Sequence, residues 1–228
     1  IPIENSIEGP VTTTLDLLIQ HKNCYINEEY VMPITQTLLT KNKIDYHDIT
    51  EIWSHPQPIA QCQSFITTHL SHCHIHITSS TATAAEKLSQ STQTNVAVIG
   101  HSTLSAIYNL TPLQHEINDN KDNETRFVHI SNTPSTPSKE DKTSIVFSTQ
   151  KDQPGSLYTM LSIFARHHIN LTKIESRPNK KKLGEYLFLV DCLGHSETAP
   201  LKDVLTHLEN HALYFKCLGS YPIGKLTK

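Results

Sequence analysis

The sequence predicts an α/β protein built from two parts. Segments typical of strands and of helices alternate through residues 1–130, which favours an α/β architecture with a largely parallel sheet. Residues 131–142 contain two Pro and no apolar side chain, a composition typical of a linker. From residue 143 to residue 228 the expected order of elements is βαββαβ. We therefore expect two separately folded parts of ordinary domain size.

Apolar spacing and turn residues set the elements of the first part. A helix is expected over 11–19, because Gly9 and Pro10 lie where a helix begins. Short runs bounded by polar and turn residues predict strands over 25–33, 49–54, 75–78 and 95–100. Helices are expected over 58–69 and 81–91. The long intervals between matching elements leave room for two lobes.

The second part has a simpler pattern. Strands are expected over 143–149, 171–176, 185–191 and 214–220, with a hairpin loop over 179–184. A helix is expected to begin at 153–156, with Leu157, Leu161 and Phe164 on one face. A second amphipathic helix is expected over 201–211. This order predicts the ferredoxin-like arrangement, a four-stranded sheet with two helices on one face.

Composition excludes several classes of protein. The chain has 19 Lys and Arg against 22 Asp and Glu, so it lacks the basic surface that nucleic-acid binding requires. No apolar run approaches the roughly 18 residues of a membrane helix, and no signal peptide opens the chain. Its 5 Cys form no CxxC pair, which favours reduced thiols in a cytoplasmic protein. We expect no nucleic-acid or membrane partner.

Polar side chains cluster where expected strands end. Such clusters lie at 4–6, 54–61, 79–81 and 123–127, and they are rich in hydroxyl and amide groups with a single Arg. Open α/β sheets place their ligands at strand ends, so this lining suits an anionic substrate held by hydrogen bonds. The alternative is structural, because Ser and Thr that precede helices are usually caps.

These clusters carry a family resemblance. The segments PIENSIEGPV (2–11), SHPQPIAQC (54–62), SSTATAA (79–85) and TRF (125–127) resemble the signature segments of prephenate dehydratase, in the same order. In the tail, PGSLY (154–158) and INLTKIESRP (169–178) resemble the regulatory ACT domain of that family. The resemblance covers nearly the whole chain, and the combination of segments is specific.

The resemblance implies an activity, a fold and a ligand. The family converts prephenate to phenylpyruvate by decarboxylative dehydration, on the way to phenylalanine. The reaction makes the ring aromatic, so no redox cofactor is needed, and we expect none. The implied fold is a two-lobed catalytic domain (1–130) of the periplasmic-binding-protein type II kind, a linker (131–142) and an ACT domain (143–228). L-Phenylalanine is the implied allosteric inhibitor, bound where ACT domains meet in a homodimer or homotetramer.

The resemblance also assigns roles to residues. The matching catalytic positions are Asn5, Ser54, Gln61 and Thr125. Thr125 is expected to donate a hydrogen bond to the departing hydroxyl group, because a Thr hydroxyl is too weak an acid to protonate it. The residues expected to bind substrate are Ser79, Ser80, Thr81, Arg126 and Glu4. An internal salt bridge is the alternative for Arg126, and a structural carboxylate is the alternative for Glu4. The residues expected to bind phenylalanine are Gly155, Ser156, Leu157, Glu175, Ser176, Arg177 and Pro178.

Other interpretations remain open. A non-catalytic amino-acid sensor would use the same two parts, although it need not retain TRF together with Asn5, Ser54 and Gln61. A phenylalanine hydroxylase-like enzyme would need an iron triad, and no suitable spacing occurs. His72, His74 and His76 alternate along an expected strand and are interpreted as incidental rather than as a metal site. The family begins with a strand and a Gly-Pro-x-Gly-Thr-Phe-Ser type segment, so we expect an N-terminal strand and helix that are missing here.

Overall fold

A computed structural model describes residues 1–150, 153–180 and 185–224. Within these residues the chain divides into two compact units, one formed by Ile1–Met32 with Thr125–Lys228 and the other by Pro33–Glu124. The chain therefore passes from the first unit into the second and back again. The expected hairpin loop over 179–184 lies partly outside the described residues.

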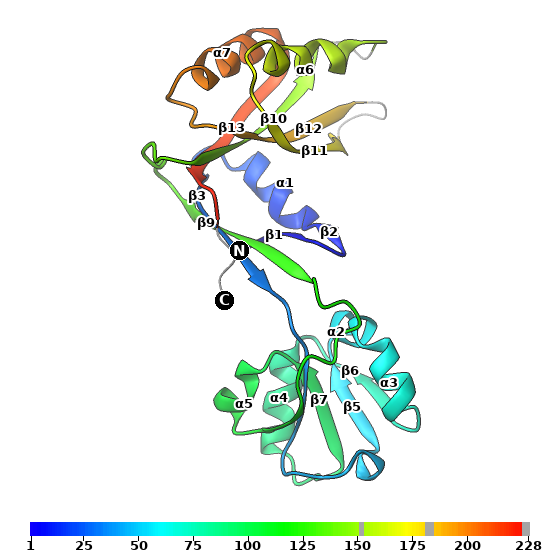
Figure 1. The fold of residues 1–228 in the computed structure, drawn as a ribbon. Helices are drawn as coiled ribbons and strands as arrows, with labels where there is room; N and C mark the ends of the chain where they lie inside the picture. Colours follow the sequence, from blue (N-terminus) through cyan, green and yellow to red (C-terminus); the bar gives the residue numbers. More distant parts are fainter. Residues whose placement is uncertain (151–152, 181–184, 225–228) are drawn as a thin grey trace. The chain divides into compact units, whose positions relative to one another are not determined.

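The tail has the expected βαββαβ order. Its elements are β10 (Asp141–Thr149), α6 (Ser156–Arg166), β11 (Leu171–Pro178), β12 (Tyr186–Leu193), α7 (Leu201–His211) and β13 (Ala212–Pro222). The sheet order is β11-β12-β10-β13 with antiparallel neighbours, which confirms the ferredoxin-like prediction. The helices α6 and α7 cover one face, where Phe147, Phe164 and Leu208 are buried together (Figure 1).

The opposite face of this sheet is covered by the beginning of the chain. Helix α1 (Thr12–Gln20) buries Leu15 and Leu18 in one core with Val146, Leu218 and Tyr221 of the tail (Figure 1). Residues 131–142 do have the composition of a linker. The residues before and after them nevertheless share the core around α1, so the expectation that the two parts fold separately is wrong there. The first residues of the chain and the tail share it because each supplies apolar side chains that would otherwise be exposed.

A small sheet completes the first unit. Its strands are β1 (Pro2–Asn5), β2 (Gly9–Pro10), β3 (Tyr25–Pro33) and β9 (Glu124–Ser131), in the order β2-β1-β9-β3. β1 and β9 are antiparallel, with Glu4 opposite Arg126 and Asn5 opposite Thr125. Successive residues of a strand point to opposite faces, so these two pairs lie on opposite faces of the sheet.

The second unit contains a mixed sheet. Its elements are β4 (Thr37–Thr40), η1 (Tyr46–Asp48), β5 (Glu51–Ser54), α2 (Pro56–Gln61), α3 (Gln63–His69), β6 (His74–Ile77), α4 (Thr81–Gln90), β7 (Val96–Gly100), α5 (Thr103–Tyr108) and β8 (Thr111–Gln114). In the order β6-β5-β7-β4-β8, the neighbours β6, β5 and β7 are parallel, whereas β4 is antiparallel to β7 and to β8. The expectation of a largely parallel sheet is therefore only partly correct.

Helices lie on both faces of the mixed sheet. α2 and α3 pack Ile59 and Ile66 against one face, and α4 and α5 pack Leu88 and Leu104 against the other. The single helix expected over 58–69 is two helices, which meet at Cys62. Among the described residues, no helix is both long and apolar enough to span a membrane.

Candidate functional site

Thr125 and Asn5 form a buried pair on one face of the small sheet. Asn5 Nδ2 donates to Thr125 Oγ1 at 2.9 Å. The orientation of the Asn5 amide is fixed, because its Oδ1 accepts from the backbone N–H groups of Ile7 and Glu8 at 3.0 Å each. The Thr125 oxygen therefore accepts the hydrogen bond from Asn5, and its own proton stays available to donate to another group.

Arg126 lies on the other face of the same strand and is held internally. Its Nε donates to Glu29 at 2.6 Å, its Nη1 donates to Asp191 at 2.6 Å, and its Nη2 donates to the Tyr221 hydroxyl at 2.7 Å. Glu4 is 3.4 Å from Nη1. The internal salt bridge weighed for Arg126 is present in the structure, and its expected contact with substrate stays a prediction. Glu4 is its structural partner and also pairs with Lys173 at 3.1 Å.

The charge of Arg126 is stabilised by these neighbours. Burial lowers the pKa of the Arg126 guanidinium, but Tyr221, Asp191 and Glu29 raise it by more, so the pKa lies above its ordinary value. Burial also raises the pKa of Tyr221 well above its ordinary value. Both shifts favour a cationic Arg126 and a neutral Tyr221 hydroxyl.

Ser54 and Gln61 belong to the second unit and are engaged there. Ser54 is fully buried at the end of β5, and its hydroxyl donates to the carbonyl of Ile99 in β7 at 2.6 Å. Gln61 Oε1 accepts from Gln36 Nε2 at 3.1 Å. Each residue thus has a structural hydrogen bond, and their expected catalytic roles stay predictions.

The hydroxyl residues 79–81 surround the N-terminus of α4. Ser80 is the N-cap, because its Oγ accepts from the backbone N–H of Thr83 at 3.0 Å. Ser79 is exposed, and its hydroxyl donates to Thr83 Oγ1 at 3.3 Å. Thr81 packs against the end of β7, where a Cβ on Gly100 would lie 3.1 Å from the Thr81 Cβ. The exposed Ser79 is thus the member best able to reach a ligand.

The structure separates the expected sites by unit. Asn5, Thr125 and Arg126 belong to the first unit, whereas Ser54 and Gln61 belong to the second, together with Ser79, Ser80 and Thr81. Gln36, which orients Gln61, was not expected to have any role, and no local motif marks it.

The residues expected to bind phenylalanine do not share one cavity. Gly155 adopts φ +85° at the start of α6, and Gly155 and Ser156 line a cavity of about 410 Å³. Leu157 instead packs against the core beneath α6. Pro178 lines a different cavity of about 480 Å³ beside α1.

In β11, Glu175 and Arg177 point toward the face that α1 covers. Arg177 Nη2 pairs with Asp16 of α1 at 2.8 Å, and Glu175 pairs with Lys173 at 3.4 Å. Ser176 is exposed. The side chains of Glu175 and Arg177 therefore have internal partners, and the expected ligand role of this segment stays a prediction.

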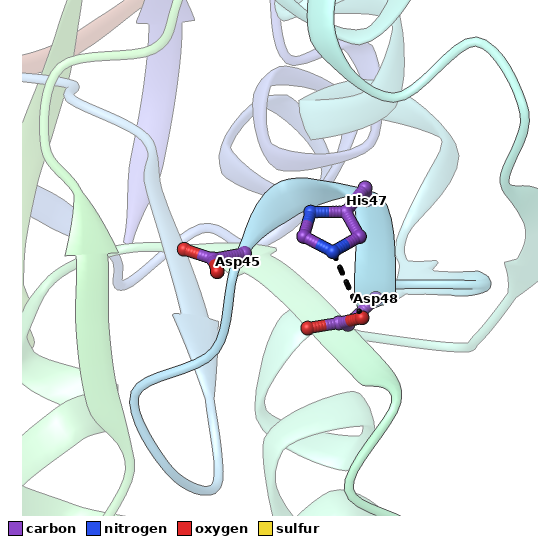
Figure 2. A group of neighbouring side chains, drawn as sticks. All are labelled: Asp45, His47 and Asp48. Carbon is purple, nitrogen blue, oxygen red and sulfur yellow. Dashed lines mark ion pairs between the residues drawn. The ribbon is translucent and has the colours of Figure 1, made fainter.

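Asp45, His47 and Asp48 are the candidate cation ligands that the described residues bring within 4.8 Å of one another. Figure 2 shows them around the short helix η1, with His47 paired to Asp48 at 3.2 Å. All three are exposed, and hard cations in proteins usually take six or more oxygen ligands, so we assign no metal to them. In β6, His76 pairs with Glu51 at 3.3 Å.

Comparison with known proteins gives the chain a family. The model of the family described as prephenate dehydratase matches residues 1–135. The chain belongs to this family. The model of the ACT domain matches residues 143–210.

Curated relatives and solved structures match almost the whole chain. The prephenate dehydratase of Methanocaldococcus jannaschii is 40% identical over 98% of this chain and 80% of its own length. A crystal structure of prephenate dehydratase from Arthrobacter aurescens in complex with L-Phe is 35% identical, with a TM-score of 0.88 over 98% of this chain and 74% of that one. A solved structure described as GqqA, a novel type of quorum quenching acylase, is 27% identical, with a TM-score of 0.84 over 98% of this chain and 81% of that one.

Glu29, Asp191 and Tyr221, which hold the arginine of the TRF segment, were missed by sequence reasoning. Asp191 does give a signal, because it is a charged residue within the apolar strand YLFLVDCL. Glu29 gives none, since it follows another Glu in a strand with a polar face.

Proposed function

We propose that this chain converts prephenate to phenylpyruvate with loss of carbon dioxide and water, and that L-phenylalanine regulates it. The observation that carries the proposal is the Asn5–Thr125 pair, which leaves a buried hydroxyl able to donate, within residues that match the prephenate dehydratase family. The proposed reaction requires neither a redox cofactor nor a metal ion.

The reaction sets the task of the site. The bond between the ring and its carboxylate breaks, its electron pair enters the ring, and the hydroxyl group leaves from the opposite ring carbon. With one proton taken up, the products are phenylpyruvate, carbon dioxide and water, so atoms and charges balance. Negative charge develops on the departing oxygen, and a preorganised donor at that point lowers the barrier.

Thr125 is suited to that donation. The Thr125 hydroxyl is buried. Its oxygen accepts the hydrogen bond from Asn5, so that bond does not use the proton of the hydroxyl. Asn5 itself is fixed by backbone N–H groups, so the donor needs little reorganisation during the reaction. The proton that finally converts hydroxide to water comes from solvent, because Thr is too weak an acid to supply it.

The remaining assignments extend the proposal. Ser79 and the free N–H groups at the start of α4 are suited to a substrate carboxylate. The tail is proposed to bind L-phenylalanine near Gly155 and Ser176, in a homodimer or homotetramer formed through ACT domains. The cytoplasm is the expected compartment, in keeping with the free thiols of the chain.

The test is direct. The purified chain is mixed with prephenate, and phenylpyruvate is followed by its absorbance with and without L-phenylalanine. We expect turnover that L-phenylalanine reduces. Hydrolysis of an acylated amine without turnover of prephenate would contradict the proposal and would align this chain with the acylase instead. Binding of phenylalanine without turnover of prephenate would favour the sensor alternative.

A further inference from the structure

A closed ring of hydrogen bonds joins the strand of Thr125 to the tail. Arg126 donates to the Tyr221 hydroxyl at 2.7 Å and to Asp191 Oδ2 at 2.6 Å. Ser144 Oγ donates to Asp191 Oδ1 at 2.5 Å. Because an ionised carboxylate only accepts, that bond uses the Ser144 proton, so the Tyr221 hydroxyl must donate to Ser144 Oγ. Donors and acceptors therefore alternate without conflict around the ring.

The ring is shielded from water and draws its members from different strands. Tyr221 of β13 is 0% exposed, Ser144 of β10 is 3% exposed and Asp191 of β12 is 7% exposed. Hydrogen bonds in such an environment are stronger than in water, and networks of this kind hold a single arrangement. Glu29 adds a further connection, because it pairs with Arg126 and also with Lys142 of β10 at 2.9 Å.

The ring lies next to the proposed hydrogen-bond donor of the reaction. Thr125 and Arg126 are neighbours in β9, and their side chains point to opposite faces of the small sheet. A rigid peptide unit joins their Cα atoms, so a shift of the Arg126 backbone, which its anchored side chain restrains, is passed directly to Thr125. The Thr125 hydroxyl must meet its target within a fraction of an ångström for full effect.

We propose that Asp191 and Tyr221 of the tail position Thr125 through Arg126, which is therefore a positioning residue rather than a substrate ligand. This inference rests on the proposed function of Thr125. It assigns to the tail a structural part in catalysis even without a regulatory ligand. It also identifies a route for regulation, because any ligand that shifts β12 or β13 relative to β9 would displace the Thr125 hydroxyl.

Tyr221→Phe and Asp191→Asn test the inference. Tyr221→Phe keeps the buried aromatic side chain and removes only its hydroxyl, so this variant should fold even if Asp191→Asn does not. Tyr214→Phe is the matched control in the same strand, because its hydroxyl donates to the Ile19 carbonyl of α1. Asp16→Asn is the control for the carboxylate, since the ion pairs of Asp16 are with Arg177 and Lys180.

Three measurements are made on each variant. We expect Tyr221→Phe and Asp191→Asn to lower kcat by about tenfold with KM for prephenate within about twofold, whereas both controls keep kcat. In the double variant with Thr125→Val, Tyr221→Phe should cause no further loss, since no hydroxyl is left to position. Hydrogen exchange of the amides of residues 124–131 should be faster in the two test variants than in the controls, each measured at the same interval below its own Tm.

Each outcome decides the inference. If kcat of Tyr221→Phe stays within twofold of the parent, or if its effect simply multiplies that of Thr125→Val, the ring is only structural and the inference is wrong. If the parent chain does not convert prephenate, the proposed function fails, and amide exchange alone decides the positioning. Unchanged exchange in residues 124–131 would then overturn it.

Discussion

Thr125 illustrates how one hydrogen bond can hold a residue and still leave it reactive. The Asn5 amide occupies the oxygen of the hydroxyl and spares its proton. Thr125→Val keeps the shape of the side chain and removes the hydroxyl. We expect kcat for prephenate to fall by about 10²–10³, the usual loss for one preorganised donor, while Thr125→Ser retains most of the activity. Steady-state kinetics with phenylpyruvate detection measure both.

Stability is the control for this pair of variants. Valine cannot accept the hydrogen bond from Asn5, so thermal unfolding must show that Thr125→Val is still folded at the assay temperature. A decrease in kcat of less than tenfold in a folded Thr125→Val protein would show that another group serves the departing hydroxyl.

Cys62 lies at the junction of α2 and α3 and gives a test of burial at a single residue. Burial, with a smaller effect of Asp119, raises the pKa of the Cys62 thiol to about 12. At pH 8 only about 10⁻⁴ of the molecules then carry a thiolate at this position. We expect Cys62 to resist an aromatic disulfide reagent in the folded protein and to react at once in denaturant, as followed by peptide mapping.

The same pKa shift of Cys62 sets the direction in which the stability of the fold changes with pH. The folded-state pKa lies above the ordinary value, so burial of the neutral thiol favours folding below that ordinary value, and this contribution is lost as the pH rises toward about 12. Rapid labelling of Cys62 at pH 8 without denaturant would show that the α2–α3 junction opens far more often than its packing indicates.

At the residue scale, local patterns found the Thr125 segment but not the partners that hold it. Arg126 and Asp191 are 65 residues apart, and no periodicity links them. The sequence left two alternatives for Arg126 because a lone Arg beside a polar cluster suits either one. Only the approach of β12 to β9 decides between them.

Among the elements, agreement is best where an apolar face repeats. The helix expected over 201–211 is α7, because Leu201, Val204 and Leu208 recur at helical spacing and are all buried. No strand was expected at β4, whose TLLT run is buried on both faces and too short to show a period. The mixed character of the second sheet follows from β4 and β8, so it was also missed.

Gly219 sets how closely β13 and β3 approach. It adopts φ +141°, and a Cβ there would lie 2.2 Å from the Ile26 carbonyl oxygen. Gly219→Ala should therefore lower the free energy of unfolding by at least about 2 kcal/mol, because backbone atoms cannot give way as a side chain can. Urea unfolding measures the loss.

Gly9→Ala is the matched control. Gly9 has φ +79° but nothing within 4 Å of the added Cβ, so only backbone strain remains and the expected loss is about 1 kcal/mol. Equal losses for the two variants would mean that β13 and β3 separate readily and that Gly219 is not required for their approach.

For the whole molecule, the shared core decides what can be removed. Val146, Leu189, Leu218 and Tyr221 of the tail complete the core around α1. A chain ending at Lys142 would leave the apolar face of α1 in water, so we expect it to lose the cooperative unfolding of the first unit and all turnover of prephenate. Calorimetry and the phenylpyruvate assay test this. A truncated chain that still turned over prephenate would show that the tail is dispensable for the fold.

At the scale of the whole molecule, the sequence predicted the order of elements in the tail but not which part of the chain packs against it. The order βαββαβ and the linker composition were visible because they depend on neighbouring residues. The packing of residues 1–32 against a sheet that begins at Asp141 depends on contacts across more than half the chain, and each strand satisfies its own pattern without them.

The double crossing of the chain between units has a consequence for biosynthesis. Residues 33–124 form a continuous compact unit, so a ribosome can release them folded while translation continues. Residues 1–32 emerge earlier, yet much of their core comes from β10, β12 and β13, so the apolar face of α1 stays uncovered until these strands have been made. We expect force measurements on arrested nascent chains to detect folding of residues 33–124 first and of residues 1–32 only after β13 has left the exit tunnel. That interval is when a chaperone would bind this protein.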